Sequence, residues 1–557
     1  MPRRRPATVL LLLAAVALPA AAVVHRQSTP HEHELLRDVY SPRFTPVPPP
    51  APAAEVLPRL REYLSSPEGE ARLRRWLPSQ AGVLWLALIV AVVAGFDLER
   101  LRNPRNADLL LILALGVLFY DILGFMRRLH DPHAVALLHW IFSAVFAVSV
   151  TLAGRAVLHA LRPMRCPWRP PLGGRSVAAL ALLLLALDGA AVLLRPPDDS
   201  SYFANLGGQR LRERGLLPYG DPLLTGTPGA AYGPLLYVAH VPFQLIVDPE
   251  PVNRISSPRP PLGNESSYRL PAPLATKLCT LAFQVLAVVS LVLAGRRLAS
   301  RDVAWALVAL YCGSAFVLGV GGDEYFIGGM TYVSHIAPPA VTTAAFAALV
   351  SNRPAAAGTL LVAGAGVGFY PAFLLPAWIG FLWHRHRERR RFLAAVAISA
   401  ALLAAFVLLC SRPAGGRSLV GTILWDTFGH HSDPAGYGSS PFGFWGQRGG
   451  VRAWLMQPLV GSSGLTSPAL LAFFGFAASA FALTRRRPAP ALALVSAAVI
   501  IGANLIKIHA TGTYVAWFYP FLLIGLFAPA AAPTPEREAA REDRTPARVS
   551  VRMGGSP

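Results

Sequence analysis

Two adjacent aspartates, Asp198 and Asp199, directly follow an apolar stretch at 176–195 and open a long polar segment at 196–271. Neighbouring carboxylates can ligate a divalent cation, or share one proton because each negative charge raises the pKa of the other group. An ordinary solvated helix end can carry the same residues. The pair alone therefore leaves a chemical and a structural interpretation open.

Other side chains suited to chemistry lie in two further polar segments. Asp323 and Glu324 stand close to glycines in a short segment, where they could line the same cavity as the first pair or form a polar turn. The segment 412–466 mixes aromatic and polar side chains, which suits the C–H faces of sugars and equally suits a membrane interface. His430 and His431 belong to it, but their tight spacing is a poor ligand set for zinc.

The elements that carry these residues are strongly apolar. The chain of 557 residues is 54% hydrophobic and 15% charged, with a mean hydropathy of +0.44. Soluble domains carry about 25% charged residues, and apolar runs of roughly 17–25 residues are long enough to cross a bilayer. We predict an all-α polytopic membrane bundle of roughly 12–14 transmembrane helices, whose polar loops form the active-site cavity. The predicted spans are 81–96, 108–126, 134–158, 176–195, 272–295, 302–320, 333–350, 393–411, 467–484, 489–506 and 513–530.

Two apolar segments do not fit a simple span. The stretch 7–24 follows basic residues and is either an uncleaved first helix, which we favour, or a cleaved signal peptide. The segment 355–383 is too long for one span and is interrupted by glycines and prolines. We predict two short helices or a re-entrant hairpin there, because irregular backbone survives at membrane depth only where protein or a cavity covers it.

The net charge of +21 is concentrated in arginine clusters between apolar runs. Short basic loops of this kind mark the cytoplasmic side of membrane proteins, so the charge does not indicate a nucleic-acid partner. The arrangement predicts that the polar tail at 532–557 lies on the cytoplasmic side of the membrane. The segments predicted inside are 3–5, 100–105, 162–175, 296–301, 385–391 and 485–487, and those predicted outside are 25–80, 196–271, 321–332, 412–466 and 507–512.

Asp121 and Asp188 fall inside predicted spans. A carboxylate at that depth costs several kcal/mol unless it faces a partner or a cavity, so both are expected to point inward. The four cysteines show neither metal-ligand spacing nor a disulfide framework, and we interpret them as packing residues.

Three short motifs in the segment 196–271 are Asp198-Asp199-Ser200-Ser201-Tyr202, Gly215-Leu216-Leu217-Pro218-Tyr219 and Tyr232-Gly233-Pro234-Leu235. Together they resemble the first large outer loop of the GT-C membrane glycosyltransferases. The resemblance is closest to family 87, which includes polyprenyl-phosphate-mannose-dependent mannosyltransferases. That loop has an aspartate, a tyrosine shortly after it, a Gly-x-x-Pro-Tyr turn and Tyr-Pro-Pro-Leu, so Gly233 stands in place of a proline.

Weaker matches extend the resemblance to about 175–525. Tyr268-Arg269-Leu270-Pro271 opens the next helix as an Arg-Leu-Pro does in many of these enzymes. The hairpin with Phe369-Tyr370-Pro371 lies where the family has a Lys-x-x-Pro hairpin, but the lysine is absent. The segment from His509 to Tyr519 is similar to the family's last outer loop.

The resemblance implies an inverting transfer of a sugar from a polyprenyl-phosphate donor to a glycolipid or cell-envelope acceptor. Asp198 is the first candidate for the general base that takes the acceptor's proton, with Asp199 next. Arg269 is the first candidate for binding the departing phosphate, followed by Lys277 and His509. A divalent cation, Mg or Mn, could bridge Asp198 and the phosphate. The remaining candidates for the cavity and the acceptor site are Tyr202, Tyr219, Tyr232, Asp323, Glu324, His430 and His431.

We therefore expect an N-terminal membrane region at 1–170, a GT-C-like domain at 171–531 and the tail at 532–557. The expected location is a bacterial plasma membrane, crossed many times, with the active site on the outer side. Two other classes stay open. A flippase or transporter of lipid-linked sugars would place charged groups near the membrane midplane, where we find only Asp121 and Asp188. The second class is a non-catalytic membrane protein, which fits the glycine at 233 in the tyrosine motif and the lysine absent from the hairpin.

Overall fold

The computed structural model describes residues 82–126, 132–162, 168–194, 199–221, 224–225, 228–247, 250–251, 269–270, 273–318, 333–429, 444–446, 467–507 and 512–528. This part of the chain is helical apart from two short antiparallel strands, β1 (Glu250–Pro251) and β2 (Arg269–Leu270). The prediction of an all-α fold is confirmed to that extent. The predictions for 7–24, 25–80 and 532–557 fall outside the described residues.

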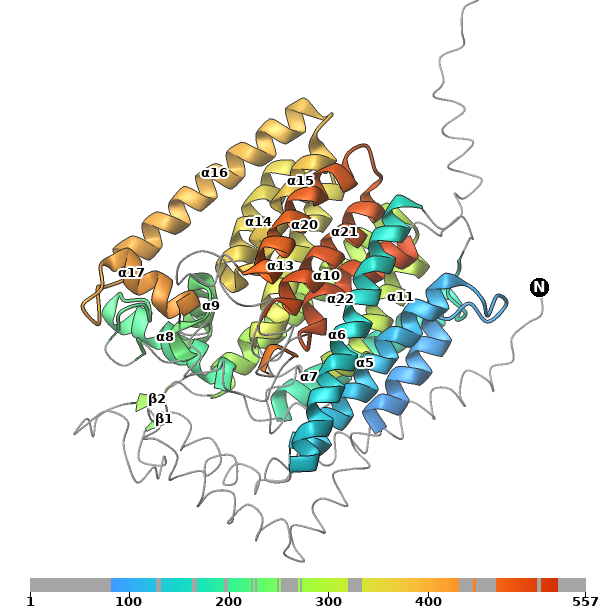
Figure 1. The fold of residues 1–557 in the computed structure, drawn as a ribbon, viewed down its shortest axis with the longest axis horizontal. Coiled ribbons are helices and arrows are strands. Elements are labelled where there is room, and N and C mark those ends of the chain that lie inside the picture. Colours follow the sequence, from blue (N-terminus) through green and yellow to red (C-terminus); the bar gives the residue numbers. More distant parts are fainter. Residues whose placement is uncertain are drawn as a thin grey trace, which may run out of the picture.

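Apolar helices form the body of the molecule (Figure 1). Five of them are long and apolar enough to cross a membrane: Trp140–Leu161, Gly174–Leu193, Leu274–Leu298, Val333–Val350 and His386–Leu409. The helices of the body are Gly82–Ala94, α5 (Pro104–Met126), α6 (Pro132–Leu161), α7 (Gly174–Leu194), α10 (Pro273–Leu298), α11 (Arg301–Cys312), α12 (Ala315–Leu318), α13 (Val333–Val350), α14 (Pro354–Gly368), α15 (Leu375–Leu382), α16 (His386–Leu409), α20 (Pro468–Thr484), α21 (Ala489–Leu505) and α22 (Val515–Phe527).

The predicted span 302–320 is corrected by the structure. Helix α11 ends at Cys312, and the short α12 begins at Ala315. Gly313 caps α11 where Val90 leaves no room for a side chain, and the Ser314 hydroxyl accepts a hydrogen bond from Val317 N at 3.3 Å. A close helix contact and a serine cap therefore interrupt a segment whose hydropathy is continuous.

The segment 355–383 forms two helices that turn back on each other, as predicted. Helix α14 ends at Gly368, Phe369 adopts a positive φ of 20°, and a 3₁₀ turn leads into α15. Thr484 Oγ1 donates to Ala377 O at 2.6 Å, which fixes α15 against the end of α20. We call the turn at Phe369–Tyr370 the hairpin tip.

The basic loops that were predicted on the inner side and that the structure describes gather at one end of the helical body, which we call the arginine end. Arg487 Nη1 donates to Leu161 O at 3.1 Å, and Arg297 Nε donates to Val350 O at 3.2 Å. Trp168 Nε1 donates to Gly95 O at 2.9 Å. These bonds satisfy carbonyl groups at helix ends, which lack partners within their own helix.

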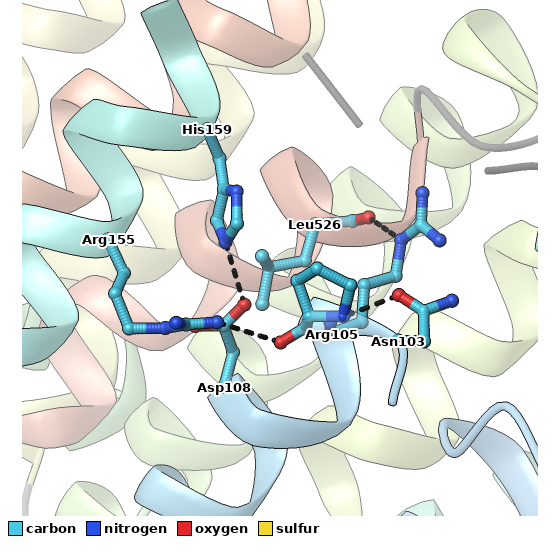
Figure 2. Close-up of polar contacts among 7 residues, drawn as sticks. Asn103, Arg105, Asp108, Arg155, His159 and Leu526 are labelled. Carbon is cyan, nitrogen blue, oxygen red and sulfur yellow. Dashed lines mark hydrogen bonds and ion pairs between the residues drawn. The ribbon is translucent and has the colours of Figure 1, made fainter. Parts of the chain in front are cut away.

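Figure 2 shows how α5, α6 and α22 are joined at the arginine end. The carboxylate of Asp108 in α5 pairs with Arg155 and His159 of α6. His159 Nε2 lies 3.0 Å from it. Arg105 is fully buried, and its Nε donates to Leu526 O at 2.9 Å. A buried carboxylate paired with a guanidinium fixes the relative position of helices that are apolar elsewhere.

The opposite end, which we call the loop end, carries the shorter helices α8 (Asp199–Arg214), α9 (Pro234–Gln244) and α17 (Leu419–Leu424). Figure 1 shows α16 along one flank of the body, with α17, α8 and α9 near its lower end. Because α16 joins the arginine end to the loop end, the chain crosses the whole body there. Most of the residues with predicted chemistry belong to the loop end.

Candidate functional site

The acidic start of α8 is attached to the start of α13. Asp199 is the first residue of α8, and the two serines after it form hydrogen bonds with α13. Ser200 Oγ lies 2.9 Å from Ser334 Oγ, and Ser201 Oγ accepts from Val333 N at 3.1 Å. The positive pole of α8 is therefore held at the first turn of α13.

A cation and several aromatic rings lie beside that junction. Lys507 donates to the Tyr514 hydroxyl, and its Nζ lies 3.7 Å from the centre of the Tyr514 ring. The Tyr514 ring lies 4.5 Å from His335 and 4.4 Å from Trp517. We call Lys507, His335, Tyr370, Tyr514 and Trp517 the Lys507 cluster.

Two contacts connect this cluster to α13 and to the hairpin. Trp517 Nε1 donates to Ser334 O at 3.2 Å, so Ser334 contacts both Trp517 and Ser200. The Tyr370 ring stacks on Trp517 with centroids 4.6 Å apart. The start of α8, the hairpin tip and the segment between α21 and α22 thus meet at one place, although about 170 and 140 residues separate them along the chain.

Sequence reasoning missed Lys507 and His335 but contained a signal for the first. The chain has only two lysines, Lys277 and Lys507, among its 51 basic Lys and Arg residues. Where arginine serves nearly every cationic position, a lysine marks a place at which a compact ammonium is preferred to a planar guanidinium. Both lysines lie at the loop end.

Three of the predicted site residues have described side chains. Lys277 is half-buried and donates to Leu193 O at 2.7 Å, so it satisfies a carbonyl at the end of α7. Tyr219 is buried, and its hydroxyl donates to Tyr232 O at 2.6 Å. Its hydroxyl therefore holds the loop together, and the role of Tyr219 at a cavity stays a prediction. Tyr232 is half-buried and packs against Leu217, Tyr219 and Tyr237.

The other predicted site residues cannot be placed at side-chain level. Asp199 and Tyr202 lie in α8 and Arg269 in β2, but only their backbone is described. The remaining residues lie outside the described part of the chain, namely Asp198, Asp323, Glu324, His430, His431 and His509.

Buried polar groups organise the loop that follows α8. Tyr237 of α9 donates to Gly229 O at 2.7 Å and accepts from Tyr232 N at 3.1 Å. Burial raises the pKa of both Tyr219 and Tyr237, so each stays a neutral hydrogen-bond donor. His240 is also buried, and desolvation lowers its pKa to about 4. The hydrogen bonds of Tyr219 and Tyr237 thus fix the backbone of the loop at Gly229 and Tyr232.

Two buried carboxylates fix the same loop from other elements. Asp221 accepts two hydrogen bonds from Arg210 of α8, from Nε at 2.9 Å and from Nη2 at 3.2 Å. Asp426, in the π-helical turn Trp425–Gly429, accepts from Gly220 N at 3.0 Å and from Thr225 Oγ1 at 2.9 Å. The chain after α16 therefore holds the turn at Gly220 in place.

Replacing Gly220 by alanine should detach this turn. Gly220 has a φ of +78°, and a β-carbon there would overlap the carbonyl oxygen of Arg412, a backbone atom that cannot rotate away. We expect limited proteolysis of the purified protein to cleave near 220 much faster in Gly220→Ala than in wild type. Gly215→Ala is the control, because Gly215 also has a positive φ but no atom near its added β-carbon. Equal protection of both variants would contradict the predicted overlap.

Asp188 lies inside the helical body, as predicted. It is fully buried in α7 and accepts from Gln284 Nε2 of α10 at 3.0 Å, while Tyr311 of α11 donates to Gln284 Oε1 at 3.4 Å. A cavity of about 20 Å³ lies elsewhere, among apolar residues of the helix Gly82–Ala94, α5 and α11–α12. Its lining is mainly apolar, with Leu84, Leu109 and Phe316 among the residues, and the hydroxyl-bearing side chains in it are Ser314 and Tyr519.

The described residues contain no group of three or more His, Cys, Asp and Glu that could hold a metal ion. The described side chains at the junction offer one ammonium, one imidazole, and serine and tyrosine hydroxyls beside a helix start. Such groups suit an anionic phosphate, and the Tyr and Trp rings suit the C–H face of a sugar.

No family model, curated protein or solved structure matches this chain.

Proposed function

We propose that this protein is a polytopic membrane glycosyltransferase of the GT-C type, which transfers a sugar from a polyprenyl-phosphate donor to a glycolipid or cell-envelope acceptor. The observation that carries the proposal is the junction of the acidic start of α8 with the Lys507 cluster at the loop end. It brings an acid-bearing helix start and a cation to one place, as an inverting transfer to a hydroxyl requires.

We place the protein in a bacterial plasma membrane; the apolar flanks and the two ends of the body support the membrane itself. Large apolar side chains are exposed along the flanks, including Val150, Leu182, Val289 and Ile398. The arginine end fits the cytoplasmic side by the positive-inside rule, which puts the loop end outside. On that side a polyprenyl chain would lie among the helices while the sugar phosphate reaches the junction.

Each group then has a definite task. Asp198, with Asp199 next, would take the proton of the acceptor hydroxyl as it attacks the anomeric carbon from the face opposite the phosphate. Lys507 and the N–H groups at the start of α8 would stabilise the negative charge on the leaving phosphate. Lys277 and Arg269 remain further candidates for that task. A divalent cation beside Asp198 would supply the same stabilisation.

The test is transfer of radiolabelled sugar from polyprenyl-phosphate-mannose into the lipid and polymer fractions of membranes. Asp198→Asn should lower the transfer rate about 10²–10⁴-fold, the usual contribution of a general base. Glu213→Gln is the matched control, because Glu213 is an exposed carboxylate at the far end of α8. Repeating the assay with EDTA tests the divalent cation.

Undiminished transfer by Asp198→Asn would remove Asp198 from the mechanism and direct the test to Asp199 and Asp323. If wild type transfers neither mannose nor any of a panel of other polyprenyl-linked sugars, the glycosyltransferase proposal fails and the flippase or transporter becomes the leading candidate.

Asp188 favours a second candidate, a flippase or transporter of lipid-linked sugars. Its carboxylate lies deep in the helical body beside Gln284, as expected for a group on a transport path. Under this alternative, Asp188→Asn should stop movement of a fluorescent lipid-linked sugar across proteoliposomes made with the protein. A glycosyltransferase should transfer sugar yet give no such movement in wild type.

A further inference from the structure

An unusual group of cations surrounds one imidazole at the arginine end. His384 Nε2 accepts from Arg485 Nε at 3.2 Å and from Arg486 Nε at 3.1 Å. The two guanidinium groups approach the same nitrogen atom, so they also lie close to each other. Desolvation and the charges of the two arginines lower the pKa of His384 and so favour the neutral imidazole that accepts both bonds.

A third guanidinium joins this group around Trp383. The Arg389 Cζ lies 4.4 Å from the centre of the Trp383 ring, and the Arg485 Cζ lies 5.9 Å from it. Arg389 is fixed by a bond from Nη1 to Trp383 O at 2.7 Å. Among the described residues no carboxylate forms an ion pair with Arg389, Arg485 or Arg486, and the nearby Glu388 pairs with Arg385.

The backbone of Arg486 is strained in a way that maintains this arrangement. Its φ is +62°, in the left-handed region that glycine adopts freely and that side chains with a β-carbon seldom adopt. Stability alone would favour glycine at this turn. An arginine there indicates that the position of its guanidinium has a use.

The start of α16 adds positive charge to the same place. Helix α16 begins at His386, and its first six residues include Arg387, Arg389, Arg390 and Arg391. Helices usually carry acidic residues in the first turn, because the free N–H groups form the positive pole. The first turn of α16 holds Glu388, but the four arginines around it leave the start of the helix strongly positive. Repulsion among these cations decreases when an anion binds between them, so the group suits a phosphate.

We propose that His384, Arg389, Arg485 and Arg486 form a binding site for the phosphate of an anionic phospholipid in the inner leaflet. Trp383 is 37% exposed beside the arginines, and Leu393, one helical turn beyond Arg389 on the same face of α16, is 36% exposed. A lipid can contact this apolar surface with its chains while its phosphate reaches the guanidinium groups. The site shares the membrane placement of the proposed function but does not depend on sugar transfer.

The test measures the unfolding temperature of the full-length protein in detergent with added phosphatidylglycerol or phosphatidylcholine. Wild type should gain roughly 2–4 °C more from phosphatidylglycerol than from phosphatidylcholine. Arg486→Gly removes one guanidinium and relieves the strained backbone. It should therefore unfold at a higher temperature than wild type without lipid, and should lose the preference for phosphatidylglycerol.

Two control experiments decide whether the preference for phosphatidylglycerol comes from this site and from the lipid. Arg100→Gln/Arg102→Gln removes two exposed arginines from another loop at the arginine end and should keep the preference. If this control loses it as fully as Arg485→Gln/Arg486→Gln does, the attraction is a general effect of charge and the site is refuted. Inorganic phosphate that reproduces the whole shift would refute the lipid as its source. No preference in wild type would also overturn the proposal.

Discussion

Replacing Lys507 by glutamine should lower the rate of sugar transfer about 10²–10³-fold, which is the usual cost of removing one group that stabilises a developing negative charge. Lys507 is half-buried among aromatic rings, with its Nζ 3.7 Å from the centre of Tyr514 and 5.7 Å from that of Trp517. A cation in such surroundings interacts with a phosphate more strongly than one in water. The loss should appear in kcat, because charge develops on the leaving phosphate in the transition state.

Two companion variants separate charge from structure. Lys507→Arg keeps the charge but replaces the compact ammonium by a planar group, so it should restore part of the rate. Arg214→Gln removes an exposed cation at the end of α8 and should leave the rate unchanged. If Lys507→Gln transfers sugar at the wild-type rate with normal thermal stability, Lys507 has no part in the reaction and Arg269 or Lys277 becomes the leading candidate.

The helical body could be predicted from the sequence because its signals are local. Hydropathy located the apolar helices within a few residues, and glycines with prolines indicated the reversal between α14 and α15. The break between α11 and α12 was missed, since it depends on Val90 packing against Gly313, a contact between distant segments. The cost of a buried carboxylate correctly placed Asp188 inside.

The candidate site was less predictable, because its parts come together only through folding. His335 belongs to α13 and Lys507 to the segment that follows α21, and neither stands in a recognisable motif. Tyr219 was expected at a cavity because it belongs to the Gly-x-x-Pro-Tyr motif of the resemblance. Its hydroxyl satisfies the carbonyl of Tyr232 in a buried loop, where an unsatisfied carbonyl would be costly. A motif thus locates a loop more reliably than it assigns tasks to the side chains within it.

The Arg210–Asp221 pair bears on how the loop end is held together. Its side chains are 3% and 0% exposed, so replacing Arg210 by methionine leaves Asp221 buried without its guanidinium. Breaking a buried pair in this way costs about 3–5 kcal/mol, whereas replacing both partners by apolar residues is often neutral. Arg210→Met should therefore open the loop, and Arg210→Met/Asp221→Leu should close it again.

Hydrogen exchange of the purified protein measures this opening directly. Backbone amides at 217–221 should exchange about 10²–10³-fold faster in Arg210→Met than in wild type, while those of α21 should be unchanged. Arg212→Met is the matched control, because its pair with Glu213, which is 46% exposed, contributes about 0–1 kcal/mol. Its bond from Nη1 to Gln244 O, at 2.9 Å, lies outside 217–221. Gly220 in this loop donates its N–H to Asp426, so the variant should also weaken the attachment of the loop to the π-helical turn. Equal exchange in Arg210→Met and Arg212→Met would mean that Asp426 and the tyrosines alone hold the loop.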